Sequence, residues 1–168
     1  MDHALLWSLA AGACTALGAG ILFLKKRWSS RSLSFFLGLA SGVMLAVVFF
    51  DMLPSAFILN AAVKVAAGLA MGIFIMVLVN SALFEGINAA ESMLGLGYLI
   101  MLGIALHDLP EGMAIAFGGE MKARTGMVIA LGIGIHNLPE GMAIAAPLIM
   151  SGMKKRSILF KTVLIGLI

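Results

Sequence analysis

Five long apolar stretches constrain the fold of this chain more than any other feature of its sequence. Each contains about 20 residues or more, the length that a helix needs to cross the ~30 Å hydrocarbon core of a bilayer. They comprise residues 4–24, 33–53, 65–84, 96–117 and 126–150. A sixth stretch begins near Ile158 and extends over about 16 Å, half of the core, by Ile168. Because lipid offers the backbone no hydrogen bonds, we expect an all-α, polytopic transmembrane helix bundle with five full spans and a partial sixth.

The composition supports a membrane protein with one domain. Hydrophobic residues make up 62% of the chain and charged residues 11%, whereas soluble proteins average about 45–50% and about 25%. No linker or low-complexity segment separates a second domain, so we expect residues 1–168 to form a single transmembrane domain. The net charge of +3 comes from short basic runs between apolar stretches, which are typical of topology signals. We therefore expect the lipid bilayer as a partner and no nucleic acid.

The distribution of basic residues predicts the orientation. The N-terminus has no Lys or Arg before the first apolar stretch, and Lys25, Lys26 and Arg27 follow it, the reverse of a secretory signal peptide. With the N-terminus outside, eight basic residues lie inside (25, 26, 27, 31, 154, 155, 156 and 161) and three outside (64, 122 and 124), as the positive-inside rule requires. We expect a multi-pass protein of the cell (inner or plasma) membrane with its N-terminus outside.

Two copies of one motif lie in the fourth and fifth spans. Residues 106–116 read LHDLPEGMAIA, and residues 135–145 read IHNLPEGMAIA. Ten of these eleven positions are identical or exchange Leu for Ile, and the exception is Asp108 against Asn137. Both copies lie near the middle of their spans, and consecutive spans run antiparallel. The copies can therefore face each other at the bilayer midplane, where transporters commonly place their sites.

The charge in this layer argues for a bound cation. His107, Asp108, Glu111, His136 and Glu140 lie at one depth, and none of the five apolar stretches contains Lys or Arg. An ionisable side chain at a helix centre costs about 2.5–3.5 kcal/mol on insertion scales. A purely structural role would leave three carboxylates without a basic partner, whereas a metal cation would neutralise them. We therefore favour a metal site over a structural role.

The spacing within each motif suits metal ligation. His107 and Glu111 are four residues apart and share one helix face, and His136 and Glu140 repeat this pattern. Two imidazoles and two carboxylates can thus converge between two helices. Nitrogen and oxygen ligands suit Zn²⁺, and also Fe²⁺, Mn²⁺ or Cd²⁺, better than Mg²⁺ or Cu⁺. We expect zinc as a transported substrate and no organic cofactor.

A second metal position next to the first is a further hypothesis. Asp108 and Asn137 each lie one position further round their helices than the histidines. They could form an oxygen-rich site that Glu111 and Glu140 bridge to the first. The site would then be binuclear.

The prolines and glycines of the motifs have mechanical roles. Pro110 and Pro139 each remove a helix hydrogen bond, and the freed carbonyls can face a cation or water. Gly112 and Gly141 are expected to let another helix approach closely.

Two residues of the second span are weaker candidates. Met44 lies in mid-span, where core packing is the favoured interpretation and a thioether ligand the alternative. Asp51 ends the span just before Pro54. A carboxylate there could help cations to enter from outside, and a solvated helix end explains it equally well.

These patterns resemble the ZIP (Zrt/Irt-like protein) metal transporter family, in particular its prokaryotic GufA/ZupT-like branch. The resemblance includes both His-x-x-Pro-Glu-Gly motifs, ALGAG at residues 16–20, SGVMLA at 41–46 and FDMLP at 50–54. It implies eight transmembrane helices with both termini outside, a binuclear metal centre on the fourth and fifth helices, and a homodimer. Members mostly move zinc, and some move iron, manganese or cadmium. The positions that match family ligands are His107, Asp108, Glu111, His136, Asn137 and Glu140, with Met44 as a contributor in some members.

The chain departs from the family pattern in three ways. Its last residues lie in what resembles the sixth of eight helices, so we expect the N-terminal portion of a ZIP-like transporter, truncated in that helix. Residues 85–91 contain no histidine, where many members carry several. Asp108 stands where the first motif usually has Asn, which makes the site more anionic.

Three functions remain open on the sequence. The leading one is a transmembrane transporter of a divalent metal cation, zinc foremost. The second is a metal-binding fragment or subunit of a larger transporter that does not itself transport. The third is an intramembrane metalloenzyme, which we do not favour because the chain has no separate nucleophile and no HExxH pair.

Overall fold

The structure is a computed structural model that describes residues 2–24, 29–84 and 93–168, without the side chains of residues 2, 30, 33, 51, 59, 83 and 84. Within these ranges every regular element is helical, which confirms the predicted all-α bundle. The elements are α1 (Asp2–Phe23), α2 (Ser30–Val47), the π-helical segment η1 (Val48–Met52), α3 (Leu53–Leu59), α4 (Ala62–Phe84), α5 (Met93–Met121), α6 (Ala123–Met150) and α7 (Lys155–Ile165).

Five helical segments are long and apolar enough to cross a membrane, as predicted. They are His3–Phe23, Ser34–Ile58, Ala62–Ala82, Met93–Met121 and Ala123–Met150. The second combines α2, η1 and α3, because the helix continues through the π-helical turn that precedes Pro54. The predicted partial sixth span is α7.

The connection between α5 and α6 sets the geometry of the two motifs. Lys122, in extended conformation, is the one residue between the two helices. Next to it the backbones approach closely, because a Cβ at Gly126 would lie 2.8 Å from the backbone of Gly119. The two helices therefore run antiparallel and side by side, as predicted, and their midpoints meet.

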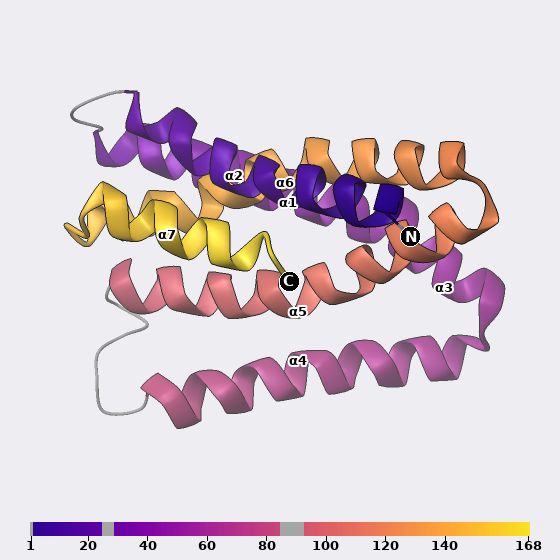
Figure 1. Cartoon of the computed structure of the whole chain (residues 1–168). Helices are drawn as coiled ribbons and strands as arrows, with labels where there is room; N and C mark the ends of the chain where they lie inside the picture. Colours follow the sequence, from indigo (N-terminus) through magenta and orange to yellow (C-terminus); the bar gives the residue numbers. More distant parts are fainter. Residues whose placement is uncertain (1, 25–28, 85–92) are drawn as a thin grey trace.

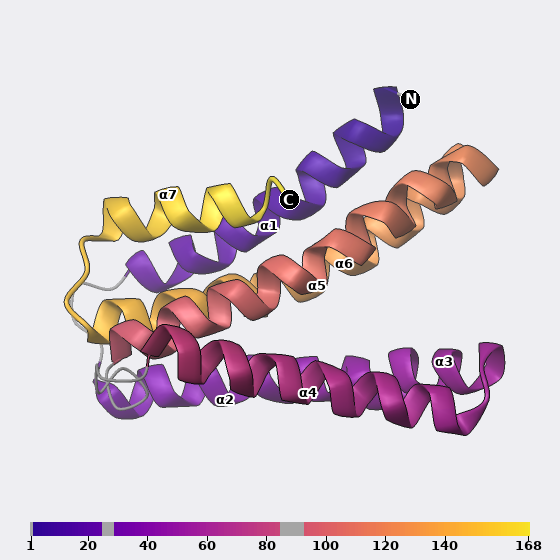
Figure 2. The same cartoon turned by 90° about the horizontal axis from the view of Figure 1, so that it is seen from below.

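The helices form three layers. Figure 2 shows α5 and α6 between a layer of α1 and α7 and a layer of α2, α3 and α4. In the first layer α1 packs against both α6 and α7, and in the last layer α2 packs against α6. Figure 1 shows α4 lying along the edge of the bundle, next to α5, and no residue in its apolar window is buried. Because α4 exposes apolar side chains all round, lipid is the solvent that suits it.

Small residues bring α1 and α6 into backbone contact. A Cβ at Gly141 would overlap the carbonyl oxygen of Thr15, and one at Gly18 would overlap the carbonyl oxygen of Leu138. The close approach predicted for Gly141 is therefore confirmed. The one predicted for Gly112 is wrong for the described residues, because a Cβ there would meet the Ile168 carbonyl oxygen at an ordinary 3.8 Å.

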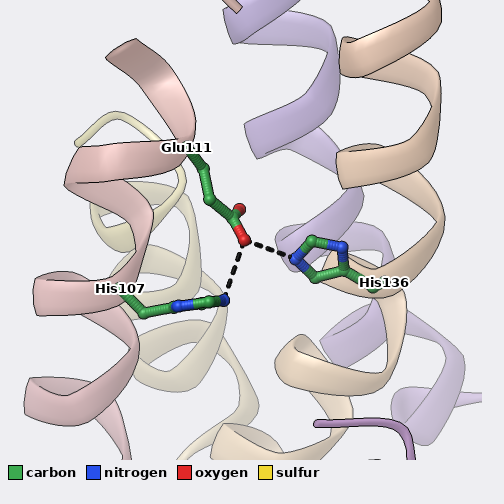
Figure 3. Close-up of side chains that lie close together, drawn as sticks. All are labelled: His107, Glu111 and His136. Atoms are coloured by element: carbon green, nitrogen blue, oxygen red, sulfur yellow. Dashed lines mark hydrogen bonds and ion pairs between the residues drawn. The ribbon is translucent and has the colours of Figure 1, made fainter. Parts of the chain in front are cut away.

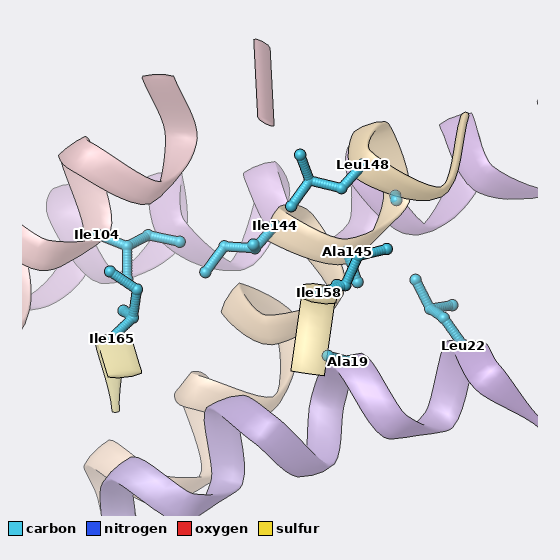
Figure 4. Packing of buried hydrophobic residues seen from close by; sticks show 9 residues of the cluster. Ala19, Leu22, Ile104, Ile144, Ala145, Leu148, Ile158 and Ile165 are labelled. Carbon is cyan, nitrogen blue, oxygen red and sulfur yellow. The ribbon is translucent and has the colours of Figure 1, made fainter. Parts of the chain in front are cut away.

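The apolar core lies between α6 and its neighbours. Ile144 and Leu148 of α6 are fully buried and pack with Leu22 of α1, Ile104 of α5 and Ile158 of α7 (Figure 4). Because lipid tails are as apolar as these side chains, the core stabilises the bundle through van der Waals packing between the helices rather than through removal from water. The core thus anchors the C-terminal half of α6, beyond its motif.

Candidate metal centre

The two histidines lie about halfway along their helices. His107 is in the middle of α5 and His136 in the middle of α6, and Pro110 and Pro139 continue these helices without a break. Their ring centroids are 5.9 Å apart. The prediction that both motifs lie at one depth and face each other agrees with this geometry.

Glu111 connects the two imidazoles. Its Oε1 lies 2.8 Å from His107 Nε2 and 2.7 Å from His136 Nε2. Figure 3 shows the carboxylate pointing from α5 into the space between the rings. One ligand atom from each of these three residues lies within 4.8 Å of the others. The atoms that meet here are those that bind zinc in proteins: imidazole nitrogens and a carboxylate oxygen.

Glu140 lies beside this triad and is almost completely buried. Its side chain is 1% exposed, and Oε1 lies 3.7 Å from His107 Nε2 and 3.9 Å from His136 Nε2. These distances are too long for hydrogen bonds, and neither carboxylate oxygen has a hydrogen-bond partner among the described residues. A buried carboxylate without a partner is costly. The four residues predicted as ligands therefore converge, and a small displacement of Glu140 would complete a set of four.

Asp108 and Asn137 lie on another side of the cluster. Asp108 is 8% exposed and Asn137 is 3% exposed. Together with Glu111 they line a cavity of about 270 Å³, which α1 and residues 165–168 also line. Asp108 Oδ1, Asn137 Oδ1 and Glu111 Oε2 have no hydrogen-bond partner in the described ranges. Three residues predicted for a second site thus line this cavity, and each has a buried oxygen atom without a hydrogen-bond partner among the described residues.

Another cavity approaches the cluster from the side of α2 and α4. It has about 380 Å³ and is lined by His107, His136, Glu140 and apolar residues of α2, α4 and α5. Met44 also lines it, and Met44 packs against the apolar core. The structure thus places Met44 near the cluster without deciding between packing and ligation. Asp51 lies in η1, and its side chain is among those that the structure does not describe.

Acidic residues of the cluster line both cavities. Glu111 lines one cavity, Glu140 lines the other, and none of the described residues that line either cavity is Lys or Arg. A cation could therefore be held between the cavities and exchange with both.

Sequence reasoning missed the contribution of α1. Asn137 Nδ2 donates a hydrogen bond of 3.1 Å to the carbonyl oxygen of Ala11. Thr15, one turn further along α1, is fully buried, and its Oγ1 has no partner in the part of the chain that is described. A backbone carbonyl has no signature in the sequence, although the small residues of α1 were a signal for close packing.

Comparison with known proteins gives one family. A family model described as ZIP Zinc transporter matches residues 84–168. The zinc transporter ZupT of Escherichia fergusonii is 34% identical over 178 residues, which cover 95% of this chain and 67% of that protein. ZupT of Shigella dysenteriae and ZupT of Escherichia coli are each 32% identical over 132 residues, 68% of this chain and 49% of theirs. The matches thus span from 49% to 67% of the length of these curated relatives.

The match agrees with the motifs and with the helix bundle. It includes both copies of His-x-x-Pro-Glu-Gly and the helices that carry them. The relatives are transporters and not enzymes, which removes the metalloenzyme alternative. The resemblance stated from the sequence is confirmed: this multi-pass membrane chain belongs to the ZIP zinc transporter family, in its prokaryotic ZupT-like branch.

Proposed function

We propose that this chain is a single transmembrane domain that binds and transports a divalent metal cation, with zinc as the first substrate. The observation that carries the proposal is the convergence of His107, Glu111, His136 and Glu140 between α5 and α6. Two imidazole nitrogens and two carboxylate oxygens are a ligand set that zinc accepts in tetrahedral geometry. Fe²⁺, Mn²⁺ and Cd²⁺ are further candidate substrates because they accept the same donors.

A binuclear centre is the finer form of the proposal. Asp108, Asn137 and the second oxygen of Glu111 would hold a second cation beside the first. Glu111 is suited to bridge the two, because Oε1 lies between the imidazoles and Oε2 has no hydrogen-bond partner among the described residues. The extra charge of Asp108 would favour a second cation over a neutral water network.

The two cavities support a route for the cation. With the N-terminus outside, the cavity next to the first residues of α1 is the outer one, and the cavity between α2, α4 and α5 is the inner one. Met44 would contact the cation on the inner side through its thioether. Asp51, at the predicted outer end of the second span, would attract cations toward the protein. Transport would then consist of alternating contact of the ligand cluster with each cavity.

A non-transporting metal-binding protein is the alternative, and one experiment separates the two. The purified chain is reconstituted in liposomes that contain a zinc indicator, and zinc entry and zinc binding are both measured. Glu111→Ala and Glu140→Ala should abolish both. Glu120→Ala is the matched control, because Glu120 is an exposed glutamate near the end of α5 and should leave both unchanged.

The outcomes are distinct. Zinc entry that requires both glutamates supports transport, and binding without entry supports the alternative. If the wild-type chain bound no transition metal, both functions would be excluded. The homodimer implied by the family resemblance is tested in the same preparation by chemical cross-linking in the membrane.

A further inference from the structure

The carboxamide of Asn137 connects the metal centre with α1. Its Nδ2 donates to the Ala11 carbonyl oxygen at 3.1 Å in a buried environment. A carbonyl oxygen can only accept, so this bond determines that the NH₂ end of the amide faces α1. The other end, Oδ1, is buried and has no hydrogen-bond partner within the described residues. The Nδ2 group of Asn137 is thus used in the hydrogen bond to α1, whereas Oδ1 is available to a ligand. Asn137 lines the same cavity as Asp108 and Glu111.

This bond gives a physical reason for the one difference between the motif copies. A carboxylate at position 137 would have no hydrogen to donate and would place a negative oxygen against the Ala11 carbonyl oxygen. Asp108 occupies the equivalent position on α5, and its Oδ1 has no such partner in the described structure. An amide is therefore required where α1 crosses α6, whereas a carboxylate is accepted on α5.

The backbone around this bond leaves α1 little room to shift. Gly141, one turn after Asn137, lies against the carbonyl of Thr15, one turn after Ala11. Gly18 lies against the carbonyl of Leu138. A displacement of α1 along α6 would therefore have to break these close contacts, and it would also move the acceptor of the Asn137 amide.

We propose that Asn137 is a positioning residue. It couples occupancy of the metal centre to the close packing of α1 against α6. A cation at Oδ1 polarises the amide and strengthens the hydrogen bond from Nδ2 to Ala11, because linked hydrogen bonds reinforce one another. Because coupling between two sites is reciprocal, close packing of α1 against α6 raises the affinity of the site for the cation. The proposal rests on the proposed metal-binding function and goes beyond it, because it makes α1 part of the site.

The alkylation rate of Cys14 can report this coupling without an introduced label site. It is the one cysteine of the chain and lies on α1, partly buried, close to Ala11 and Thr15. A Cβ at Gly134 of α6 would lie 3.3 Å from its sulfur, so the thiol is at the interface between the two helices. Separation of α1 from α6 would expose Cys14 and accelerate its alkylation.

The experiment measures alkylation of Cys14 by N-ethylmaleimide in the purified full chain, with and without Zn²⁺, and zinc binding in the same samples. In the wild type, zinc should slow alkylation by about fivefold or more, within the ordinary range of coupling between two sites. Asn137→Asp is compared with the wild type at zinc concentrations at which zinc binding, measured in the same samples, is saturated. Under these conditions zinc should change the alkylation rate of the variant by less than about twofold. Asn137→Ala is the second variant, in case the aspartate prevents folding.

Thr15→Val is the matched control on the same helix. It removes the neighbouring buried hydroxyl and keeps the bond from Asn137 to Ala11, so it should retain the protection by zinc. Protection that persists in zinc-bound Asn137→Asp or Asn137→Ala, or that is lost in Thr15→Val, would overturn the coupling while the proposed function stands. A wild-type chain that binds no zinc would overturn the proposed function and the coupling together.

Discussion

Glu111 and Glu140 are equivalent in the repeated motif, but their surroundings differ. Glu111 Oε1 has two imidazole nitrogens within 2.8 Å. Glu140 is 1% exposed, and its oxygens have no hydrogen-bond partner in the described ranges. Removing a carboxylate from water costs several kcal/mol unless a partner compensates it. At the scale of single residues, Glu140 therefore depends on a cation more than Glu111 does.

Glu140→Gln tests this difference. The substitution removes a buried charge at nearly constant volume, so the metal-free protein should become more stable by about 1 kcal/mol or more. Zinc affinity should fall by more than about a hundredfold, because a direct ligand is lost rather than a supporting partner. Thermal melting in detergent and zinc titration measure the two effects. Glu120→Gln at the exposed end of α5 should change neither, and a less stable metal-free Glu140→Gln protein would contradict the argument.

The protonation of the ligands predicts a pH dependence of zinc binding. Imidazole and carboxylate bind metal only when deprotonated, so protons compete with zinc for His107, Glu111, His136 and Glu140. Zinc affinity should therefore decrease as the pH is lowered from about 7.5 to about 5.5, and the decrease should be less steep in His136→Ala, which has one competing group fewer. Titration with a zinc indicator at each pH measures both slopes. Equal slopes would mean that His136 is not a ligand.

At the scale of helices, backbone contact between α1 and α6 holds the site together. Glycines make this contact possible at Gly18 and Gly141, where an added Cβ would overlap a carbonyl oxygen of the facing helix. Overlap with backbone cannot be relieved by a rotamer change, unlike overlap with a flexible side chain. The α1–α6 pair should therefore tolerate larger residues poorly at these two positions.

Gly141→Ala and Gly132→Ala form a matched pair on α6. A methyl group at Gly141 would force α1 away from α6 and should destabilise the protein by about 3 kcal/mol or more, the upper part of the usual cost of overpacking. At Gly132 nothing lies within 4 Å of an added Cβ. There the same substitution should stabilise the helix by about 0.5–1 kcal/mol through its lower backbone entropy cost. Melting temperatures in one detergent compare the two, and equal stabilities would contradict the close packing.

At the scale of the whole molecule, the sequence predicted the features that follow from the spacing of residues along a helix and from their position along the apolar spans. It placed His107, Glu111, His136 and Glu140 together because spacing by four residues and antiparallel spans leave little choice. It could not predict the bond from Asn137 to Ala11, because every residue has a carbonyl and only the packing of α1 selects this one. The same limit explains Gly112: its repeat partner Gly141 meets α1, whereas Gly112 meets no helix in the described structure.

The orientation of the bundle in the membrane is predicted from the distribution of basic residues alone. Two exposed connections between helices allow this orientation to be tested. Asn60 follows α3 and Ser151 follows α6, and both are exposed at connections between helices. If eight basic residues lie inside and three outside, Asn60 faces outward and Ser151 inward. In a Cys14→Ala background, a maleimide that cannot cross membranes should label Asn60→Cys in intact cells and should label Ser151→Cys only after permeabilisation. The opposite pattern would invert the bundle, and the cavity beside the start of α1 would then be the inner one.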